Sequence, residues 1–451
     1  MSPHDGADAH LPAVRRGYFV GRALADLHAS GASSTELVRH SLAAIAELDP
    51  VLNAFAAVDQ DGATAAAQQA DEERASGIDR GPLHGIPVAV KDIVDVASLP
   101  ATMGSAHLAD RVATTDAECV RRLRAAGAVI VGKTTTHQFA FGPTGDRSAT
   151  GATRNPHDPG RMSGGSSSGS ASAVAAGMVP VALGTDTGGS VRIPAALCGV
   201  VGFKPAYGTV PTDGVFPVAG SLDTVGVLAG TAADCLHTWR TLAGLPPGPA
   251  ANAPTPTRIA WLRPFSDVGV DPAVQQVARE ALGQVDEVTW PAATETREAF
   301  LAVQTYEVAG VHADMMANSP ELYDPEVLDR LRGASHTPAA RHAWGIEQRD
   351  RLRATVLELL DDHQILALPT VPIVAPQLQQ REVDILGSTV GTRDALLSLT
   401  SPWNLLGLPA VSVPTGTVAG LPVGTQLIAR ADAAELLLSA ADDLRMTQGA
   451  A

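Results

Sequence analysis

Apolar and polar side chains follow one another with helical spacing near the start of the chain. Residues 33–48 predict a helix whose apolar positions fall on one side. Ser33 and Glu36 have the spacing of a capping box, which satisfies the free N–H groups at a helix start. Pro50 is expected to stop this helix, because proline has no N–H to continue the hydrogen-bond ladder. The apolar positions are Leu37, Leu42, Ile45 and Leu48.

Further along, predicted helices alternate with short apolar runs. Residues 61–76 and 116–126 predict helices, and residues 87–90 and 128–131 predict short buried strands. Such alternation is typical of βα units built around a sheet, so we expect an α/β fold.

The second half of the chain gives a weaker pattern. Residues 295–345 carry no readable periodicity, and residues 245–256, which are rich in Pro, predict a surface connection. Helices are predicted at 272–282 and 346–361, a strand at 258–262, and further apolar blocks at 365–368, 404–414 and 420–428. Since no repeat or long linker divides these segments, we expect residues 1–451 to form a single domain.

Composition excludes several classes of protein. Hydrophobic residues make up 45% of the 451 residues, which is enough for a sizeable core. The net charge of −16 argues against a nucleic-acid partner, because nucleic acid is bound by a basic face. Apolar runs such as residues 174–183 are shorter than the ~20 residues of a membrane span, and no signal-peptide pattern is evident. We expect a soluble, cytoplasmic protein without a nucleic-acid or membrane partner.

The cysteines show no metal-binding spacing. Cys119, Cys198 and Cys235 form no C-x-x-C pair, and no H-E-x-x-H motif occurs. An odd number of cysteines is typical of reduced thiols in the cytoplasm. The sequence therefore predicts neither a metal nor another cofactor.

Candidate chemistry is concentrated in two clusters of Gly and Ser and in one lysine. The clusters span residues 163–169 and 184–194, and an apolar run upstream ends at Lys91. A flexible linker is the ordinary interpretation of a Gly/Ser string, and a lone lysine ordinarily lies at the surface. We favour an acyl-transfer site, because no domain boundary flanks the first string and a second Gly-Gly-Ser follows it closely.

Ser190 is the candidate nucleophile of such a site. It follows two glycines, whose missing side chains allow a tight turn in which the N–H groups of residues 187–190 converge. Such N–H groups stabilise the oxyanion that forms when an amide carbonyl is attacked. Asp186 and Arg192 flank the turn and are expected to hold it, whereas Ser167 is expected to orient the site or to cap the following helix.

Lys91 is the candidate base, since no histidine lies near either cluster in the sequence. A lysine with the usual pKa of about 10.4 is charged at neutral pH, so it must be buried among apolar groups to accept a proton. The apolar run before Lys91 offers that setting. Ser166 is placed to carry the proton from Ser190 to Lys91 and later to the leaving group.

Two other motif matches are rejected. Residues 127–134 fit the P-loop pattern, but a predicted helix precedes them and their interior is an apolar strand. Residues 165–169 fit the G-x-S-x-G pattern of a nucleophile elbow, but no hydrophobic strand leads into that turn.

The lysine and the two serine clusters, in this order and at these intervals, resemble the amidase signature family. The resemblance implies a mixed, twisted sheet covered by helices on both faces of a single large domain. It also implies that Lys91 is the base, Ser166 a serine on a cis peptide bond and Ser190 the acylated nucleophile. The oxyanion hole that it implies consists of the backbone amides of Thr187, Gly188, Gly189 and Ser190.

The resemblance is strong over residues 20–240 and moderate over residues 346–445, while residues 250–345 are expected to be a variable, substrate-side region. The start of the chain looks like the branch that contains the A-type chain of tRNA-dependent amidotransferases. That branch usually has Asn, Glu and Pro at three positions where this chain has Thr135, Gln138 and Val227. These differences indicate a free-standing hydrolase.

The stretch around residues 135–145 looks similar to urethanases and to enzymes like aryl acylamidases. If that likeness holds, an apolar pocket accepts the acyl or aryl part of the substrate. The candidate pocket residues are Met103, Phe139, Ala140, Phe141 and Phe216.

The sequence thus predicts a serine hydrolase that cleaves the C–N bond of a small amide, anilide or carbamate substrate, as a monomer or homodimer. Two alternatives stay open. One is an amidotransferase chain of the A type, which releases ammonia from glutamine for a partner chain. The other is a catalytically inactive binding protein, which is less favoured because all three catalytic positions are filled.

Overall fold

An eleven-stranded sheet forms the centre of the molecule. The computed structural model describes residues 16–246, 248, 257–265 and 269–449. The strands are β1 (Phe55–Val58), β2 (Pro87–Lys91), β3 (Val129–Thr134), β6 (Val181–Thr185), β7 (Val201–Lys204), β8 (Val225–Ala229), β9 (Ile259–Leu262), β10 (Asp286–Val288), β11 (Ile365–Pro369), β14 (Ala410–Val418) and β15 (Leu421–Ile428). Their order across the sheet is β1-β3-β2-β6-β8-β7-β14-β15-β11-β9-β10.

The sheet is mixed, as the resemblance implied. Strand β2 runs parallel to both β3 and β6, whereas β8 runs antiparallel to β6 and β7. On the other side β14 and β15 form an antiparallel hairpin, and β11 runs parallel to β9. Two small two-stranded sheets lie apart from it, one formed by β4 (Arg154–Asn155) and β5 (Asp158–Met162) and the other by β12 (Glu382–Ile385) and β13 (Ser388–Gly391).

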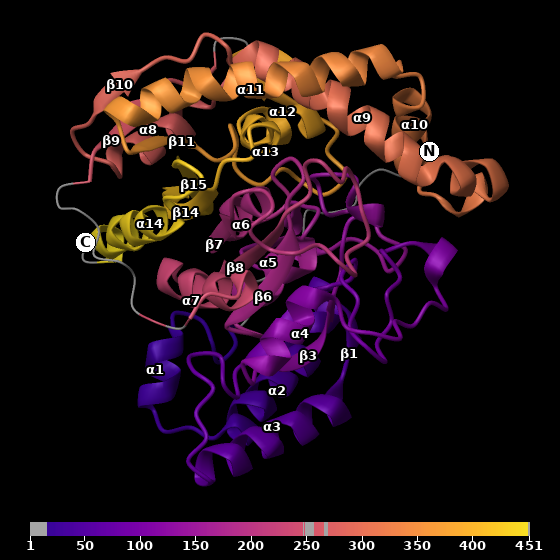
Figure 1. Cartoon of the computed structure of the whole chain (residues 1–451), viewed down its shortest axis with the longest axis vertical. Helices are drawn as coiled ribbons and strands as arrows, with labels where there is room; N and C mark the ends of the chain where they lie inside the picture. Colours follow the sequence, from indigo (N-terminus) through magenta and orange to yellow (C-terminus); the bar gives the residue numbers. More distant parts are fainter. Residues whose placement is uncertain (1–15, 247, 249–256, 266–268, 450–451) are drawn as a thin grey trace, which may run out of the picture.

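Helices cover both faces of the sheet (Figure 1). One face carries α2 (Ser34–Leu52), α3 (Gln60–Ala75), α5 (Ser168–Ala175) and α6 (Arg192–Cys198). The other carries α1 (Leu24–Ala29), α4 (Glu118–Ala125), α7 (Ala232–Ala243) and α14 (Ala434–Gly449). Strand β2 shows the alternation that this requires, since Ala89 packs in the first core while Val88 and Val90 pack in the second. The predicted α/β fold with both faces covered is confirmed.

Long helices close one end of the molecule, drawn at the top of Figure 1. These are α9 (Ala293–Asn318), α10 (Pro325–Ala334) and α11 (Ala339–Asp362). Helix α9 also packs with the shorter α13 (Ser401–Leu405), which contacts α12 (Thr392–Ser398), while α8 (Pro272–Glu280) packs on β11, β14 and β15. Trp261, Trp290 and Trp403 are the largest side chains of the core that lies there. The region without readable periodicity is therefore mostly helical.

The predicted end of α2 is wrong. The capping box is present, since Ser33 Oγ accepts from the Glu36 N–H and the Glu36 carboxylate accepts from the Ser33 N–H. The helix nevertheless passes through Pro50 and ends at Leu52. Proline so near the end removes only one bond of the ladder, and the Asp49 carboxylate satisfies the N–H groups that follow.

The other predicted elements agree with the structure to within a few residues, except that α11 begins at Ala339 instead of residue 346. Strands β2, β3, β9, β11, β14 and β15 all lie on predicted apolar runs. Most of the predicted connection at 245–256 lies outside the described residues. No helix in the described part of the chain is both long and apolar enough to cross a membrane.

Candidate active site

Lys91 occupies the carboxyl end of β2, where the neighbouring parallel strands β3 and β6 also end. Its side chain has no exposed surface, and Nζ donates hydrogen bonds to Ser166 Oγ at 2.7 Å and to Thr185 Oγ1 at 2.8 Å. Burial lowers the pKa of Lys91 to about 7, although the charges of Asp186 and Asp223 oppose the shift. A large share of this amine is therefore neutral at physiological pH and able to accept a proton.

Ser166 lies on the turn before α5, and the peptide bond between Gly165 and Ser166 is cis. A Cβ on Gly165 would lie 2.8 Å from the backbone nitrogen of Gly145, so the turn requires glycine there. The carbonyl of Ser166 accepts hydrogen bonds from the N–H of His137 at 3.2 Å and from the hydroxyl of Thr136 at 3.1 Å. These contacts hold the backbone of Ser166 while its hydroxyl contacts Lys91.

Ser190 lies in the turn between β6 and α6 and is 7% exposed. Its carbonyl accepts a hydrogen bond from the N–H of Ser167 at 3.1 Å, which joins this turn to the start of α5. The Ser167 hydroxyl donates to the carbonyl of Thr185 and accepts from its N–H, each at 3.2 Å. Ser167 makes no helix-capping bond with its side chain, so the capping alternative is wrong, and the orienting alternative stays a prediction.

Asp186 is the centre of the polar contacts that hold the turn. Its carboxylate accepts from the N–H groups of Gly189 at 2.8 Å and Val191 at 3.1 Å. The Arg192 guanidinium donates to both carboxylate oxygens, and the amide of Asn404 donates at 2.8 Å. Burial opposes ionisation of Asp186, but the charge and hydrogen bonds of Arg192 outweigh it and hold the pKa well below its usual range. The flanking charged residues thus form the scaffold of the turn.

The four backbone N–H groups of the predicted oxyanion hole fall into two classes. The N–H of Gly189 already donates to Asp186 Oδ1. Among the hydrogen bonds of the described residues, the N–H groups of Thr187, Gly188 and Ser190 have no acceptor. Buried N–H groups without a partner are rare in folded proteins. Three of the four groups are therefore available to a developing oxyanion.

The predicted pocket residues divide into two groups. Met103, Phe139, Ala140 and Phe141 are buried, and Phe216 is partly buried. The ring centroids of Phe139 and Phe216 lie 5.5 Å apart, and the Phe139 N–H donates to the carbonyl of Met103 at 2.8 Å. Phe141 instead lies near the guanidinium groups of α10 and α12. All five residues belong to one hydrophobic core or pack against it, and their role as a substrate pocket stays a prediction.

Three rings that the sequence motifs did not identify complete an aromatic group around Phe139. The Phe139 centroid lies 4.6 Å from that of His312, 5.4 Å from Tyr323 and 5.6 Å from His107. His312 Nδ1 is 2.9 Å from the Tyr323 hydroxyl. Neither His312 nor Tyr323 was identifiable, because both lie in the segment without readable periodicity. We call Phe139, Phe216, His107, His312 and Tyr323 the aromatic group.

Residues 322–330 pack against the loop that carries Phe139. The Gln138 side-chain amide donates to the carbonyl of Leu322 at 3.3 Å, and its oxygen accepts from the N–H of Asp324 at 2.8 Å. Arg330 donates to the carbonyl of Phe141 at 2.9 Å and lies 3.2 Å from His137 Nε2. The segment from α9 to α10 therefore covers the loop whose backbone contacts Ser166.

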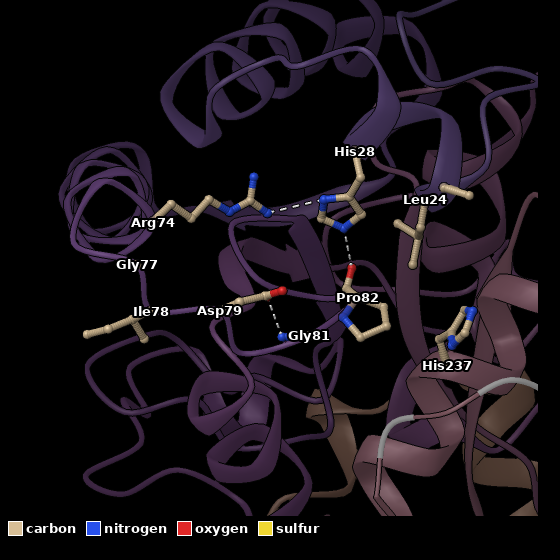
Figure 2. Close-up of a pocket in the computed structure, with 10 residues that line it drawn as sticks. Leu24, His28, Arg74, Gly77, Ile78, Asp79, Gly81, Pro82 and His237 are labelled. Atoms are coloured by element: carbon tan, nitrogen blue, oxygen red, sulfur yellow. Dashed lines mark hydrogen bonds between the residues drawn. The ribbon is translucent and has the colours of Figure 1, made fainter.

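The surface pocket shown in Figure 2 lies away from the three candidate catalytic residues. It has a volume of about 620 Å³ and is lined mainly by α1, the end of α3 and the loop after α3. The His28 ring spans it, with Nε2 2.8 Å from the carbonyl of Pro82 and Nδ1 3.2 Å from Arg74. The candidate chemistry is thus enclosed, and this open pocket does not belong to it.

The described residues contain no group of three or more His, Cys, Asp or Glu side chains placed to hold a metal ion. Cys119, Cys198 and Cys235 are buried and free. Burial raises the pKa of the Cys198 thiol, as expected for a small buried side chain and not for a nucleophile.

Known proteins resemble this chain over almost its whole length. The family model described as Amidase matches residues 36–438. The A chain of the glutamyl-tRNA(Gln) amidotransferase of Roseiflexus sp. (strain RS-1) is 36% identical over 91% of this chain and 92% of its own length. The AtzE chain of the 1-carboxybiuret hydrolase of Pseudomonas sp. (strain ADP) is 36% identical over 89% of this chain and 92% of its own. A solved structure is described as a vestigial protein complex that reveals the evolutionary origins of an s-triazine catabolic enzyme. It is 33% identical to this chain with a TM-score of 0.89, and the match covers 94% of this chain and 97% of that chain.

Proposed function

The chain belongs to the amidase signature family, and we propose that it hydrolyses the C–N bond of an amide, anilide or carbamate through a covalent intermediate on Ser190. The observation that carries the proposal is the contact of Lys91 Nζ with Ser166 Oγ at 2.7 Å, where both side chains are buried. A buried amine with a pKa lowered to about 7 is suited to take a proton from a serine hydroxyl.

In the first half-reaction neutral Lys91 accepts the proton of Ser166, which in turn accepts the proton of Ser190. Ser190 Oγ forms a bond to the carbonyl carbon, and the carbonyl oxygen becomes an oxyanion. The free N–H groups of Thr187, Gly188 and Ser190 are placed to stabilise that charge. Return of the proton through Ser166 to the substrate nitrogen lets the C–N bond break and releases an amine.

In the second half-reaction water attacks the acyl- or carbamoyl-enzyme. Lys91 and Ser166 remove a proton from the water, and the same N–H groups stabilise the second oxyanion. The bond between the carbonyl carbon and Ser190 Oγ then breaks, and Ser190 recovers its proton. When the C–N bond of a carbamate breaks, the amine leaves, Ser190 carries an alkoxycarbonyl group, and hydrolysis of that group yields a carbonate half-ester.

The finer proposal is that the substrate carries an aromatic or other apolar group. The aromatic group supports this, because its central ring, Phe139, lies on the loop whose backbone contacts Ser166 and the other four rings pack around it or beside it. Flat apolar side chains of this kind accept aryl groups by edge and face contacts. The enzyme is further proposed to work in the cytoplasm without a cofactor, because its three cysteines are free and buried and its sequence carries no metal-binding motif.

The second candidate is an amidotransferase chain of the A type, which would release ammonia from glutamine for a partner chain. The 36% identity to such a chain favours it. Against it stand Thr135, Gln138 and Val227, which occupy positions where that branch usually has Asn, Glu and Pro. A glutaminase assay and co-purification of a partner chain distinguish this candidate from a free-standing hydrolase.

Intact mass after treatment with a small fluorophosphonate tests the nucleophile. We expect one adduct on the wild-type enzyme and none on Ser190→Ala. Ser163→Ala is the matched control, because Ser163 is a buried serine of the first Gly/Ser cluster whose hydroxyl contacts only backbone carbonyls. An adduct that survives in Ser190→Ala, or a Ser190→Ala enzyme that still turns over amides at the original rate, would contradict the proposal.

A further inference from the structure

We infer that Asp223 is a positioning residue of the active site, which accepts a hydrogen bond from the Thr187 hydroxyl and so fixes the backbone N–H of Thr187 toward the reacting carbonyl. This inference rests on the proposed function. It adds a residue that the sequence motifs did not identify and that touches neither Lys91 nor Ser166 nor Ser190 through a hydrogen bond in the described structure.

The pairing of β6 with β8 brings the two residues together. In this antiparallel pair Thr185 lies opposite Val225, and beyond it the N–H of Asp186 donates to the carbonyl of Thr224 at 2.8 Å. Extending the register by one more residue on each strand places Thr187 opposite Asp223. The Thr187 hydroxyl donates to Asp223 Oδ1 at 2.6 Å, and both residues are buried.

Asp223 is itself held firmly. Its carboxylate accepts from the N–H groups of Val218 at 2.9 Å and Ala219 at 3.1 Å, and its own N–H donates to the carbonyl of Ala219 at 2.9 Å. Ser221, in the same turn, is tied to α9 by hydrogen bonds from its N–H and hydroxyl to the Glu307 carboxylate. A carboxylate with these partners cannot swing away, so it gives the Thr187 hydroxyl one fixed acceptor.

The two ends of the nucleophile turn are thus held by two different carboxylates. Asp186 holds the second half, because it accepts from Gly189 and Val191. The first half contains two of the three free N–H groups, those of Thr187 and Gly188. The Asp186 carboxylate accepts a hydrogen bond from neither of these two groups. Two side-chain contacts fix this half: the Thr187 hydroxyl donates to Asp223, and the Thr400 hydroxyl donates to the carbonyl of Gly188 at 2.7 Å. Only the first of them holds Thr187 itself. An oxyanion hole works only when its donors are already aimed, so this contact bears directly on the rate.

The hydroxyl of Thr187 can be removed with little change of shape by Thr187→Val, while Thr187→Ser keeps the hydroxyl and removes a methyl group. The measurements are kcat and KM on one amide substrate, the inhibition constant of a trifluoromethyl ketone that forms a tetrahedral adduct, and the melting temperature. Removing an oxyanion donor outright costs about 100- to 1,000-fold in kcat, so its misalignment is expected to cost about 10- to 100-fold.

We expect Thr187→Val to lose kcat in that range with KM within about threefold of wild type, and to bind the ketone more weakly in proportion to the loss of kcat/KM. Thr187→Ser should keep kcat within about threefold. Wild-type kcat in Thr187→Val, or equal losses in the Val and Ser variants, overturns the positioning role. If Thr187→Val does not fold, Thr187→Ala makes the same comparison with a smaller side chain.

The result separates this inference from the proposed function. An active wild type with an inactive Ser190→Ala and an unimpaired Thr187→Val refutes only the role of Asp223. A wild type that neither turns over amides nor forms an adduct on Ser190 refutes the proposed function and this inference with it.

Discussion

Lys91 Nζ contacts Ser166 Oγ at 2.7 Å although the two residues are 75 positions apart in the chain. Lys91 is the last residue of strand β2, and the turn before α5 places Ser166 against it. Burial lowers the pKa of Lys91 to about 7. The pair therefore changes its protonation state within the range in which enzymes are ordinarily assayed, and this has a direct kinetic consequence.

We expect kcat/KM to rise with pH through about pH 7. Lys91 must be neutral to accept a proton. Below the pKa of Lys91, each decrease of one pH unit should therefore lower kcat/KM about tenfold. The measurement is the pH dependence of kcat/KM between about pH 5.5 and 9 on an uncharged amide. Lys91→Arg is the control, because a guanidinium stays charged and should leave activity lower by orders of magnitude at every pH. A wild-type profile that is flat from about pH 6 to 9 would assign proton transfer to another group.

A second prediction concerns the buried ion pair of Asp186 and Arg192, neither of which has exposed side-chain surface. Arg192→Met leaves the Asp186 charge buried without its partner, which is expected to lower the free energy of unfolding by about 3–5 kcal/mol. The measurement is urea unfolding of each variant. The control is Arg111→Met, because Arg111 contacts Asp95 in the same two-pronged way but is about a third exposed, and its loss should cost about 1 kcal/mol or less.

Equal losses of unfolding free energy in Arg192→Met and Arg111→Met would show that the ion pair of Asp186 and Arg192 stabilises the fold no more than an ordinary surface ion pair does. A large loss confined to Arg192→Met would support the scaffold role that the sequence predicted for both residues.

A third prediction concerns Gly188, whose N–H is one of the three free donors. A Cβ at this position would lie 2.8 Å from Phe300 Cζ and 3.4 Å from Leu397 Cδ2. We expect Gly188→Ala to lower kcat at least about tenfold, because the backbone must move away from the Phe300 ring and carries the donor with it. Gly220→Ala is the matched control, since a Cβ there meets nothing within 4 Å.

Steady-state kinetics and melting temperatures of the two glycine variants measure this. Gly188→Ala combined with Phe300→Leu should recover part of the lost kcat, because leucine leaves space at the end of the ring. A normal kcat in Gly188→Ala, or a lowered kcat that Phe300→Leu does not restore, would show that the oxyanion donors do not depend on this contact.

Local sequence patterns were sufficient for the elements around the catalytic residues. The apolar run before Lys91 and the Gly/Ser strings predicted a buried lysine, a turn and a second turn, and the structure has all three. Pro50 misled the prediction because its effect depends on position, and two residues from a helix end it removes little. Helix α9 was missed because it buries polar side chains such as Gln304 and His312, which break the apolar periodicity.

The contacts that depend on strand register were beyond the sequence. Nothing in the string of residues marks Asp223 as a partner of Thr187, because the two meet only through the antiparallel pairing of β6 and β8. The contact between Asp186 and the Gly189 N–H is local, but no motif indicates which N–H of the turn the carboxylate binds. Motifs thus identified the candidate catalytic residues, while the assignment of individual hydrogen bonds required the fold.

The last prediction separates the aryl or carbamate hydrolase from the glutamine-dependent amidotransferase chain. We expect kcat/KM for an anilide or an N-aryl carbamate to exceed that for glutamine by about 100-fold or more, because the aromatic group offers apolar surface near the loop that contacts Ser166. Phe216 is the member of that group to alter, since it is only partly buried and its ring lies 5.5 Å from Phe139. Phe216→Leu should raise KM for the anilide several-fold and leave KM for a small aliphatic amide unchanged.

Tyr207→Leu is the control for this comparison, because Tyr207 is an aromatic side chain that is 45% exposed and lies outside the aromatic group. It should change neither KM. Equal effects of Phe216→Leu on both substrates would mean that the ring supports the fold and not the substrate. Preference for glutamine over every anilide and carbamate would favour the amidotransferase chain, and the search would then turn to the partner chain that receives the ammonia.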